Sequence, residues 1–285
     1  LRGCLHSYKS LTGKELHTVN DATPVLSNGR LLGCVSFERD IRIAKTMVNQ
    51  WLDIQKTLVR DMPLVAEPKD AHYTFRDLIG HNPKLTDMVN LAAKMATRDL
   101  NILIQGETGT GKEIIAQGIH QLSARCRENF VAINCAAVPE TLIEGVLFGT
   151  SKGAFTGSID RAGVIENANH GTLFLDEINS MSPAMQAKLL RVLQEKKVSR
   201  VGSNHSIQVD IRILSACNEN VHALIKQGKM RSDLFYRISS VILEIPPLRE
   251  RLDDLEELTL YYLEQHQTSV GPAITRITPD FWERL

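Results

Sequence analysis

The sequence lacks paired cysteines, long apolar runs and an excess of either charge. Its five cysteines are an odd number and widely spaced, without a C-x-x-C pair or histidines at zinc-ligand spacing: Cys4, Cys34, Cys126, Cys135 and Cys217. This pattern excludes a disulfide scaffold and a zinc finger. We therefore expect reduced thiols in a cytoplasmic protein.

A membrane protein and a general nucleic-acid binder are excluded in the same way. No apolar run approaches the roughly 20 residues of a membrane span, and the first ten residues contain no signal-peptide core. Lys and Arg total 33 and Asp and Glu total 33, so no net field attracts nucleic acid or anionic lipid. The sequence starts at Leu1 rather than Met and ends in a predicted helix, so we expect a piece of a longer protein.

The N-terminal part combines a β segment with a helix. Residues 15–41 contain short β-type runs separated by Asn28-Gly29, a dipeptide favoured in two-residue hairpin turns, which predicts a small antiparallel β piece. Apolar residues at helical spacing predict an amphipathic helix over 42–60: Ile43, Met47, Trp51, Ile54 and Leu58. Pro63 and Pro68 then mark a linker.

Beyond the linker, apolar strand-like segments alternate with helical ones. The predicted strands are 101–105, 130–133, 172–175, 211–215 and 241–245. The predicted helices between them are 112–123, 139–147 and 183–195. This alternation predicts an α/β fold with a parallel sheet covered by helices on both faces. Pro246-Pro247 closes this domain, and 248–285 reads as helices only.

A glycine-rich loop follows the first predicted strand of this domain. It has the phosphate-loop pattern, in Gly106, Glu107, Thr108, Gly109, Thr110, Gly111 and Lys112. The glycines let backbone N–H groups surround a phosphate, the helix N-terminus adds positive dipole, and Lys112 neutralises the β- and γ-phosphates. Glu113 stands where a Mg²⁺-binding Ser or Thr is usual, so metal binding must use other groups. A glycine-rich turn without a ligand is the disfavoured alternative.

Polar side chains end two of the predicted strands. Asp176 can reach Mg²⁺, and Glu177 can polarise an attacking water, which would separate hydrolysis from binding alone. A solvated strand end is the alternative. Asn218 follows the strand 211–217 and is predicted to position the same water or the γ-phosphate, with a helix N-cap as its alternative.

Two arginines are candidates for contact with the γ-phosphate, Arg231 and Arg237. An arginine finger raises the rate of phosphoryl transfer by about 10³ to 10⁵. If neither arginine reaches the site of its own subunit, a neighbouring subunit must supply one, which implies a ring. Surface salt bridging with Asp233 or Glu244 is the alternative, and the spacing leaves both open.

From about Tyr73 to its end, the chain resembles the AAA+ domain of bacterial sigma-54-dependent transcriptional activators. The segments that carry the resemblance are GETGTGKE (106–113), NCAA (134–137), LFGTSKGAFTGS (147–158), GTLFLDEI (171–178), LLRVLQEKKVSRVGS (189–203), MRSDLFYRI (230–238) and IPPLRERLDD (245–254). Few families combine a phosphate loop with GAFTG. This family also places Glu directly after the phosphate-loop lysine, which accounts for Glu113.

The resemblance implies an ATPase that forms a hexameric or heptameric ring, uses Mg²⁺ and opens the closed promoter complex of sigma-54 RNA polymerase holoenzyme. It implies that Lys112 binds phosphates, Asp176 binds magnesium and Glu177 activates water. It further implies that Asn134 is a switch asparagine that holds this glutamate and that Asn218 is a first sensor. Arg231 and Arg237 would be offered in trans to a neighbouring subunit, and Ile79 and Gly80 would line the adenine.

The same resemblance gives the GAFTGS loop a role. It implies that Gly153, Ala154, Phe155, Thr156, Gly157 and Ser158 form the tip of a loop inserted in a helix, facing the ring's pore. Phe155 and Thr156 would contact the sigma factor, because an exposed phenylalanine is a partner anchor and the glycines leave the tip free to move. A Phe155 folded into the core is the alternative. Ser158 replaces the family's usual alanine.

The predicted organisation has four parts: a PAS-like sensory segment (1–50), a helical linker (51–72), the AAA+ nucleotide-binding domain (73–247) and a truncated helical lid (248–285). The segment 1–50 resembles the C-terminal half of a PAS domain. Together with the motifs above, it suggests the arginine-utilisation regulators of Gram-positive bacteria as the nearest relatives. A β hairpin without a ligand is its alternative.

The sequence lacks the family's G-N-V-R-E-L stretch with a second sensor arginine, so we expect impaired hydrolysis by this chain. It also lacks the helix-turn-helix that would bind enhancer DNA. Two other functions stay open: a protein-unfolding AAA+ ATPase, and a non-enzymatic sensory and interaction module that holds nucleotide without turnover.

Overall fold

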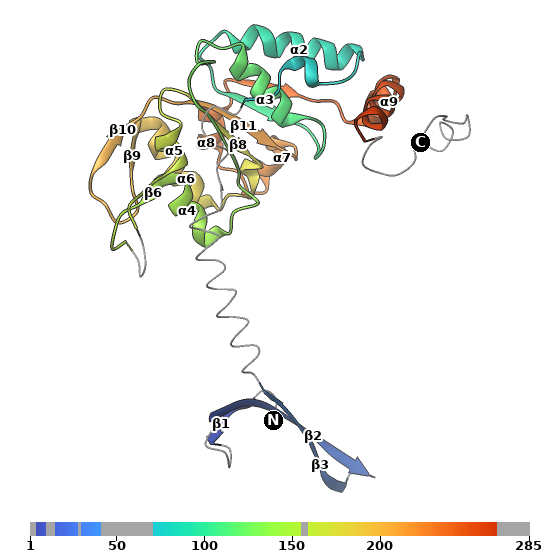
Figure 1. Cartoon of the computed structure of the whole chain (residues 1–285), viewed down its shortest axis with the longest axis vertical. Coiled ribbons are helices and arrows are strands. Elements are labelled where there is room, and N and C mark those ends of the chain that lie inside the picture. Colours follow the sequence, from blue (N-terminus) through green and yellow to red (C-terminus); the bar gives the residue numbers. More distant parts are fainter. Residues whose placement is uncertain (1–3, 10–14, 28–29, 41–70, 155–158, 267–285) are drawn as a thin grey trace. The chain divides into compact units, whose positions relative to one another are not determined.

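The computed structural model describes residues 4–9, 15–27, 30–40, 71–154 and 159–266 (Figure 1). The chain divides into two units, Leu1–Met62 and Pro63–Leu285. The helix predicted over 42–60 lies outside the described residues, as does everything predicted beyond His266. Among the helices that are described, none combines the length and apolarity needed to cross a membrane.

The first unit contains a three-stranded antiparallel sheet. Its strands β1 (Cys4–Lys9), β2 (Glu15–Ser27) and β3 (Arg30–Asp40) lie in the order β1-β2-β3. Ser27 pairs with Arg30, so β2 and β3 join through two residues, as the Asn28-Gly29 signal predicts, although the turn itself lies outside the described residues. The antiparallel β piece is confirmed, whereas its PAS-like assignment stays a prediction.

The second unit is built on a five-stranded parallel sheet. Its strands are β4 (Ile102–Gln105), β5 (Phe130–Asn134), β8 (Thr172–Asp176), β11 (Arg212–Cys217) and β12 (Val241–Glu244). They lie in the order β12-β4-β11-β8-β5, and every neighbouring pair is parallel. All five predicted strands and the predicted α/β fold are therefore confirmed.

Alternating side chains of the sheet build two cores. Ile102 and Ile104 pack into one core and Leu103 into the other, as the two-residue period of a strand requires. The first face is covered by α2 (Pro83–Ala96) and α3 (Lys112–Gln121). The second is covered by α4 (Glu140–Phe148), α5 (Val164–Asn167), α6 (Pro183–Glu195), α7 (Val221–Lys226) and α8 (Ser232–Ile238) (Figure 1).

Several elements were not predicted. Helix α2 starts at Pro83, and its N-cap Asn82 accepts a 3.0 Å hydrogen bond from the Lys84 N–H. Proline at the first helical position after an Asn cap is a recognised start signal. Helices α5, α7 and α8 were not predicted either. Two small antiparallel pairs complete the set, β6 (Gly149–Thr150) with β7 (Arg161–Ala162) and β9 (Lys197–Ser199) with β10 (Ser206–Gln208).

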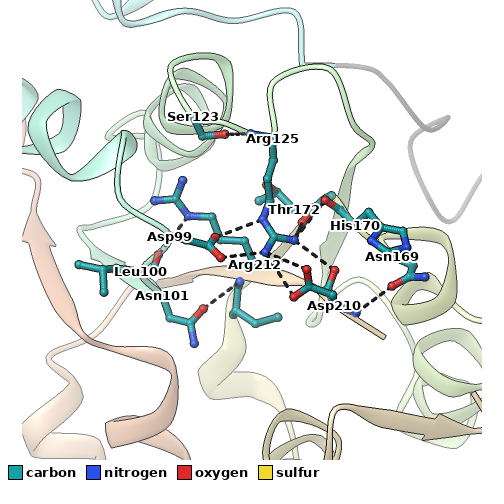
Figure 2. Close-up of polar contacts among 12 residues, drawn as sticks. Asp99, Leu100, Asn101, Ser123, Arg125, Asn169, His170, Thr172, Asp210 and Arg212 are labelled. Atoms are coloured by element: carbon teal, nitrogen blue, oxygen red, sulfur yellow. Dashed lines mark hydrogen bonds and ion pairs between the residues drawn. The ribbon is translucent and has the colours of Figure 1, made fainter. Parts of the chain in front are cut away.

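A network of charged side chains closes the amino edge of the sheet (Figure 2). The Arg125 guanidinium donates to both carboxylate oxygens of Asp99, at 3.1 and 2.8 Å, and to the backbone oxygens of His170 and Asp210, both at 3.1 Å. Buried Arg212 donates to the backbone oxygen of Ala96, the last residue of α2, at 2.9 Å and to that of Leu100 at 3.1 Å. These contacts hold the strand starts together, while the carboxyl edge carries the polar strand ends described next.

Candidate nucleotide-binding site

The phosphate-loop sequence joins the carboxyl end of β4 to α3. Gly109 and Gly111 have φ values of 82° and 95°, a region that favours glycine. Gly111 is the N-cap of α3 and provides no side chain to occupy the first N–H groups of the helix. A Cβ placed on Gly109 would meet nothing within 4 Å, so the loop is open at this point. This cradle fits the phosphates of a nucleotide.

Lys112 is held inside this loop. Its side chain is buried, and Nζ donates to the backbone oxygens of Gly106 at 2.8 Å and Glu107 at 2.9 Å. Thr110 Oγ1 also donates to the Glu107 oxygen, at 2.7 Å. Because carbonyl groups rather than a carboxylate hold the ammonium, its full charge remains to attract phosphate.

Glu113 and Gln117 form a support on the side of α3. Gln117 Nε2 donates to Glu113 Oε1 at 3.0 Å, and Gln117 Oε1 accepts the backbone N–H groups of His72 and Tyr73 at 2.8 and 2.9 Å. Glu113 therefore helps to anchor the segment that leads into the domain. Gln117 was not predicted, because its partners lie more than forty residues away along the chain.

The predicted adenine-lining residues, Ile79 and Gly80, are half-buried. They follow Leu78, whose Cδ1 would lie 2.8 Å from a Cβ placed on Gly111, so this segment passes directly beside the phosphate loop. Gly80 has a φ of 135°. The structure thus brings the predicted base and phosphate segments together, and their nucleotide roles stay predictions.

Asp176 and Asn134 meet at the ends of adjacent strands. Asn134 pairs with Asp176 in the β5–β8 register, and its Nδ2 donates to Asp176 Oδ2 at 3.3 Å. Asn134 Oδ1 accepts the backbone N–H groups of Ala136 and Ala137 at 2.9 and 3.1 Å. The resemblance implied a contact with the glutamate. In the structure, the Asn134 amide donates its hydrogen bond to the neighbouring Asp176 instead.

Glu177 has an unusual backbone. Its φ and ψ are 49° and 46°, a left-handed conformation that a residue with a side chain adopts at a cost. The Ser180 N–H and hydroxyl both bind the Glu177 backbone oxygen, at 2.9 and 2.6 Å, and hold this turn in place. Such strain concentrates at functional sites. Glu177 also carries the carboxylate that is predicted to act on water.

Cys135 lies next to these carboxylates. Burial, together with the negative charges of Asp176 and Glu177, raises the pKa of the Cys135 thiol to about 12. The thiol therefore stays protonated at neutral pH. Because a thiolate is the reactive form, this argues against Cys135 as a nucleophile of the site.

Asn218 contacts a residue that was not predicted. Asn179 Nδ2 donates to Asn218 Oδ1 at 3.0 Å and to Glu219 Oε1 at 3.2 Å, which links the turn after β8 to the end of β11. The N-cap of α7 is Asn220, which accepts the Ala223 N–H at 3.1 Å. The alternative in which Asn218 caps this helix is therefore wrong. In the sequence, only the position of Asn179 three residues after Asp176 pointed to it.

Arg231 and Arg237 lie at the two ends of α8. Arg231 forms a two-pronged ion pair with Asp233, at 3.0 and 2.7 Å, in which both side chains are nearly half exposed. Arg237 Nη2 donates to the Leu193 backbone oxygen at 2.8 Å. The salt-bridge alternative thus describes Arg231. Exposed pairs contribute little to stability, so a stronger anion from outside can compete for it.

The GAFTGS loop leaves the domain between α4 and α5. Its base is the β6–β7 pair, closed by the Thr150 hydroxyl donating to the Ile159 oxygen at 2.7 Å and by the Lys152 N–H donating to Asp160 at 3.1 Å. Gly153 and Ala154 are described, and a Cβ on Gly153 would meet nothing within 4 Å. The predicted contact residues 155–158 lie outside the described residues.

A magnesium ion would depend largely on the nucleotide. Within the described ranges, no group of three His, Cys, Asp or Glu side chains could hold a metal ion. Asp176 would then supply a carboxylate oxygen, and phosphate oxygens and water would complete the shell that Mg²⁺ prefers.

Comparisons with known proteins agree with this geometry. The family described as sigma-54 interaction domain matches residues 78–244. The chain is 37% identical over 280 residues to the transcriptional activator RocR of Bacillus subtilis, covering 98% of this chain and 58% of RocR. It is 47% identical over 199 residues to the Nif-specific regulatory protein of Bradyrhizobium diazoefficiens, covering 70% of this chain and 34% of the relative.

A solved structure shows the same fold. NtrX from Brucella abortus in complex with ATP aligns with a TM-score of 0.64 and 33% identity, over 71% of this chain and 44% of NtrX. The chain therefore spans about half the length of the proteins that it matches. From its motifs, its sheet order and these matches, the chain belongs to the sigma-54 interaction domain family of AAA+ P-loop proteins.

Proposed function

We propose that this chain is the ATPase part of a sigma-54-dependent transcriptional activator. The observation that carries the proposal is the convergence at one sheet edge: the phosphate loop after β4, Asp176–Glu177 after β8 and Asn218 after β11. A family match over residues 78–244, which includes GAFTGS, supports the transcriptional role.

The phosphate loop binds the nucleotide in this proposal. N–H groups at the start of α3 surround the phosphates, and Lys112 moves from the carbonyls of Gly106 and Glu107 to phosphate oxygens. Leu78, Ile79 and Gly80 form the wall for the base. Asp176 would hold the magnesium ion, whose charge would offset the negative charge of the phosphates.

Hydrolysis depends on the carboxylate beside the metal ligand. Glu177 takes a proton from the attacking water, and its left-handed backbone orients the side chain. Asn134 keeps Asp176 in place from the neighbouring strand. Asn218, tied to the Glu177 turn through Asn179, positions the water or the γ-phosphate.

Turnover needs a neighbouring subunit in this proposal. Arg231 and Arg237 lie at the two ends of α8, where their side chains donate to Asp233 and to the Leu193 oxygen rather than to the phosphate loop. The two arginines act on the nucleotide of the adjacent subunit, which makes the active species a ring. The gain expected from such an arginine is about 10³ to 10⁵ in rate.

The loop at 153–158 transmits the result of hydrolysis to the partner. Phe155 and Thr156 contact sigma-54 in the polymerase holoenzyme, and movement of the loop converts a closed promoter complex to an open one. The first unit acts as a sensory segment that controls ring assembly. A protein-unfolding ATPase would share the nucleotide site, but it has no need of GAFTGS.

Two assays on this chain test the proposal. Phosphate release from ATP with Mg²⁺ separates the ATPase from a module that only holds nucleotide. Capture of purified sigma-54, in competition with an unfolded model protein, separates the activator from an unfolding ATPase. Phe155→Ala should abolish sigma-54 capture and preserve phosphate release, whereas Leu91→Ala, an exposed apolar control on α2, should change neither. Capture unchanged by Phe155→Ala would contradict the role of the loop.

A further inference from the structure

The segment between Pro247 and α9 (Leu255–His266) contacts both walls of the nucleotide site. This segment, called the strap below, consists of the two short turns Leu248–Glu250 and Leu252–Asp254 with Arg251 between them. At its start, Arg249 Nη1 and Nη2 donate to the two Glu107 carboxylate oxygens, both at 2.8 Å. The strap is thus attached to the phosphate loop at one end.

Asp254 attaches the other end of the strap to the base wall. Its side chain is fully buried, and Oδ1 accepts the backbone N–H groups of His81 at 2.7 Å and Asn82 at 2.8 Å. These two residues directly follow Gly80 and lead into α2. One carboxylate therefore fixes the position of the segment that is proposed to line the base.

Gly80 leaves room for this carboxylate. A Cβ placed on Gly80 would lie 2.5 Å from Asp254 Oδ2 and 2.6 Å from its Cγ, which no real contact allows. The φ of 135° also favours glycine at this position. Sequence position 80 must thus be glycine for Asp254 to approach, and the two residues form one unit.

The second oxygen of Asp254 faces an incompletely bonded arginine. Arg251 Nη1 lies 3.8 Å from Asp254 Oδ2, and both side chains are buried. Within the part of the chain that the structure describes, Arg251 Nε, Arg251 Nη1 and Asp254 Oδ2 have no hydrogen-bond partner. Buried polar atoms without partners are costly, so this pair gains most when a small shift of the strap brings the atoms into bonding distance.

We propose that Asp254 is a positioning residue for nucleotide. It holds the base wall 78–80 to the strap, and closure of the Arg251–Asp254 gap transmits base binding to the lid helix α9. This inference rests on the proposed function, because it concerns the same nucleotide site. It adds that affinity for the base, as distinct from the phosphates, is set by a residue far from the phosphate loop in sequence.

The test is calorimetric titration of the full chain with ATP and with inorganic tripolyphosphate. Asp254→Asn keeps the size of the side chain but replaces one oxygen by an amide that points its hydrogens toward Arg251 or the backbone N–H groups. We expect ATP to bind about 10- to 100-fold more weakly and tripolyphosphate to bind within about 2-fold of the unsubstituted chain. Glu256→Gln, an exposed neutralisation two residues away, should change neither.

Steady-state kinetics of Asp254→Asn should show the same effect on binding. We expect a raised KM for ATP and a kcat within about 2-fold of that of the unsubstituted chain. Equal weakening of both ligands would assign Asp254 a general structural role and overturn the inference. ATP binding unchanged by Asp254→Asn would overturn this inference alone. Failure of the unsubstituted chain to bind ATP would overturn the proposed function and this inference with it.

Hydrogen–deuterium exchange on the unsubstituted chain provides a measurement that does not depend on the folding of a variant. ATP should slow exchange at residues 79–82 and 252–257 together, by about 10-fold or more, while tripolyphosphate should leave both segments unchanged. Protection by ATP at only one of these segments, or by both ligands alike, would contradict the coupling.

Discussion

Asn134 and Asp176 lie opposite each other on neighbouring parallel strands, and the Asn134 amide donates a 3.3 Å hydrogen bond to the Asp176 carboxylate. The same amide group accepts two backbone N–H groups from the loop that follows β5. One side chain therefore links the predicted metal ligand to the turn between β5 and α4. The predicted role of Asn134 as a switch between the phosphates and the rest of the subunit depends on these three hydrogen bonds.

Replacement of Asn134 should uncouple binding from turnover. Asn134→Ala removes the donor to Asp176 and both acceptor contacts, so we expect kcat to fall about 10- to 100-fold while the Kd for ATP changes less than about 3-fold. Phosphate release and calorimetric titration measure the two quantities. Asn90→Ala, exposed on α2, is the matched control. A rise in Kd with an unchanged kcat would show that Asn134 serves ground-state binding instead.

Glu177→Gln should preserve ATP binding and reduce turnover by about 10² to 10⁴, because the amide cannot accept a proton from water. Glu195→Gln, which removes a carboxylate at the exposed end of α6, should have no effect on either. The measurement is single-turnover phosphate release at saturating ATP. Normal turnover by Glu177→Gln in an assembled ring would remove Glu177 from the role of general base.

Mixing of two inactive variants should test the ring. Arg237→Ala lacks the arginine offered to a neighbour, and Glu177→Gln lacks the base of its own site. In an equimolar mixture, about one quarter of the interfaces join an intact Glu177 to an intact Arg237, if subunits exchange at random in a head-to-tail ring. We expect the ATPase activity of the mixture to rise toward one quarter of that of the unsubstituted chain, about the same fraction as the intact interfaces. Activity that stays at the level of either variant alone would place Arg237 outside the neighbouring site.

His120 should make stability depend on pH. Burial, with the nearby charge of Arg212, lowers the pKa of His120 from 6.5 to about 4. The unfolded chain therefore takes up a proton on His120 near pH 6.5, whereas the folded chain does so only near pH 4. The contribution of neutral His120 to the free energy of unfolding is fully present above pH 6.5 and is lost as the pH falls. The loss from this group should reach roughly 2 kcal/mol at pH 5.

The pH dependence can be assigned by substitution. His120→Gln should remove the change in the free energy of unfolding between pH 6.5 and 5, measured by denaturant titration, while exposed His222→Gln should retain it. Carboxylates are a separate effect: the Arg125 guanidinium lowers the pKa of Asp99, so that contribution is lost only at more acidic pH. An unchanged slope in His120→Gln would assign the dependence to other groups.

The sheet and most of its helices could be predicted because their patterns are local. Five short apolar runs separated by helical segments give a parallel sheet, and the helix predicted over 183–195 has those bounds in the structure. Helix α2 was missed although Asn82-Pro83 signals its start and its buried residues Leu85, Met88, Ala92 and Ala96 follow the helical period. Strand order is a long-range property that no local pattern contains.

The residues of the candidate site also divide into those that a local pattern predicts and those that depend on long-range contacts. Lys112, Asp176 and Glu177 could be predicted since parallel strands bring their carboxyl ends to one edge. Asp254 could not, because its partners His81 and Asn82 lie more than 170 residues away along the chain. Asn179 was also missed, since its link to Asn218 depends on the order of β8 and β11. Long-range contacts of single polar side chains leave no periodic trace in a sequence.

The left-handed backbone of Glu177 has a consequence for directed evolution. Glycine and asparagine adopt this conformation more easily than glutamate, so a library at position 177 selected only for heat resistance should enrich those two residues. Every such winner would lack the carboxylate. Thermal selection of this domain must therefore be paired with a screen for phosphate release. Without that screen, it will select thermostable variants that no longer hydrolyse ATP.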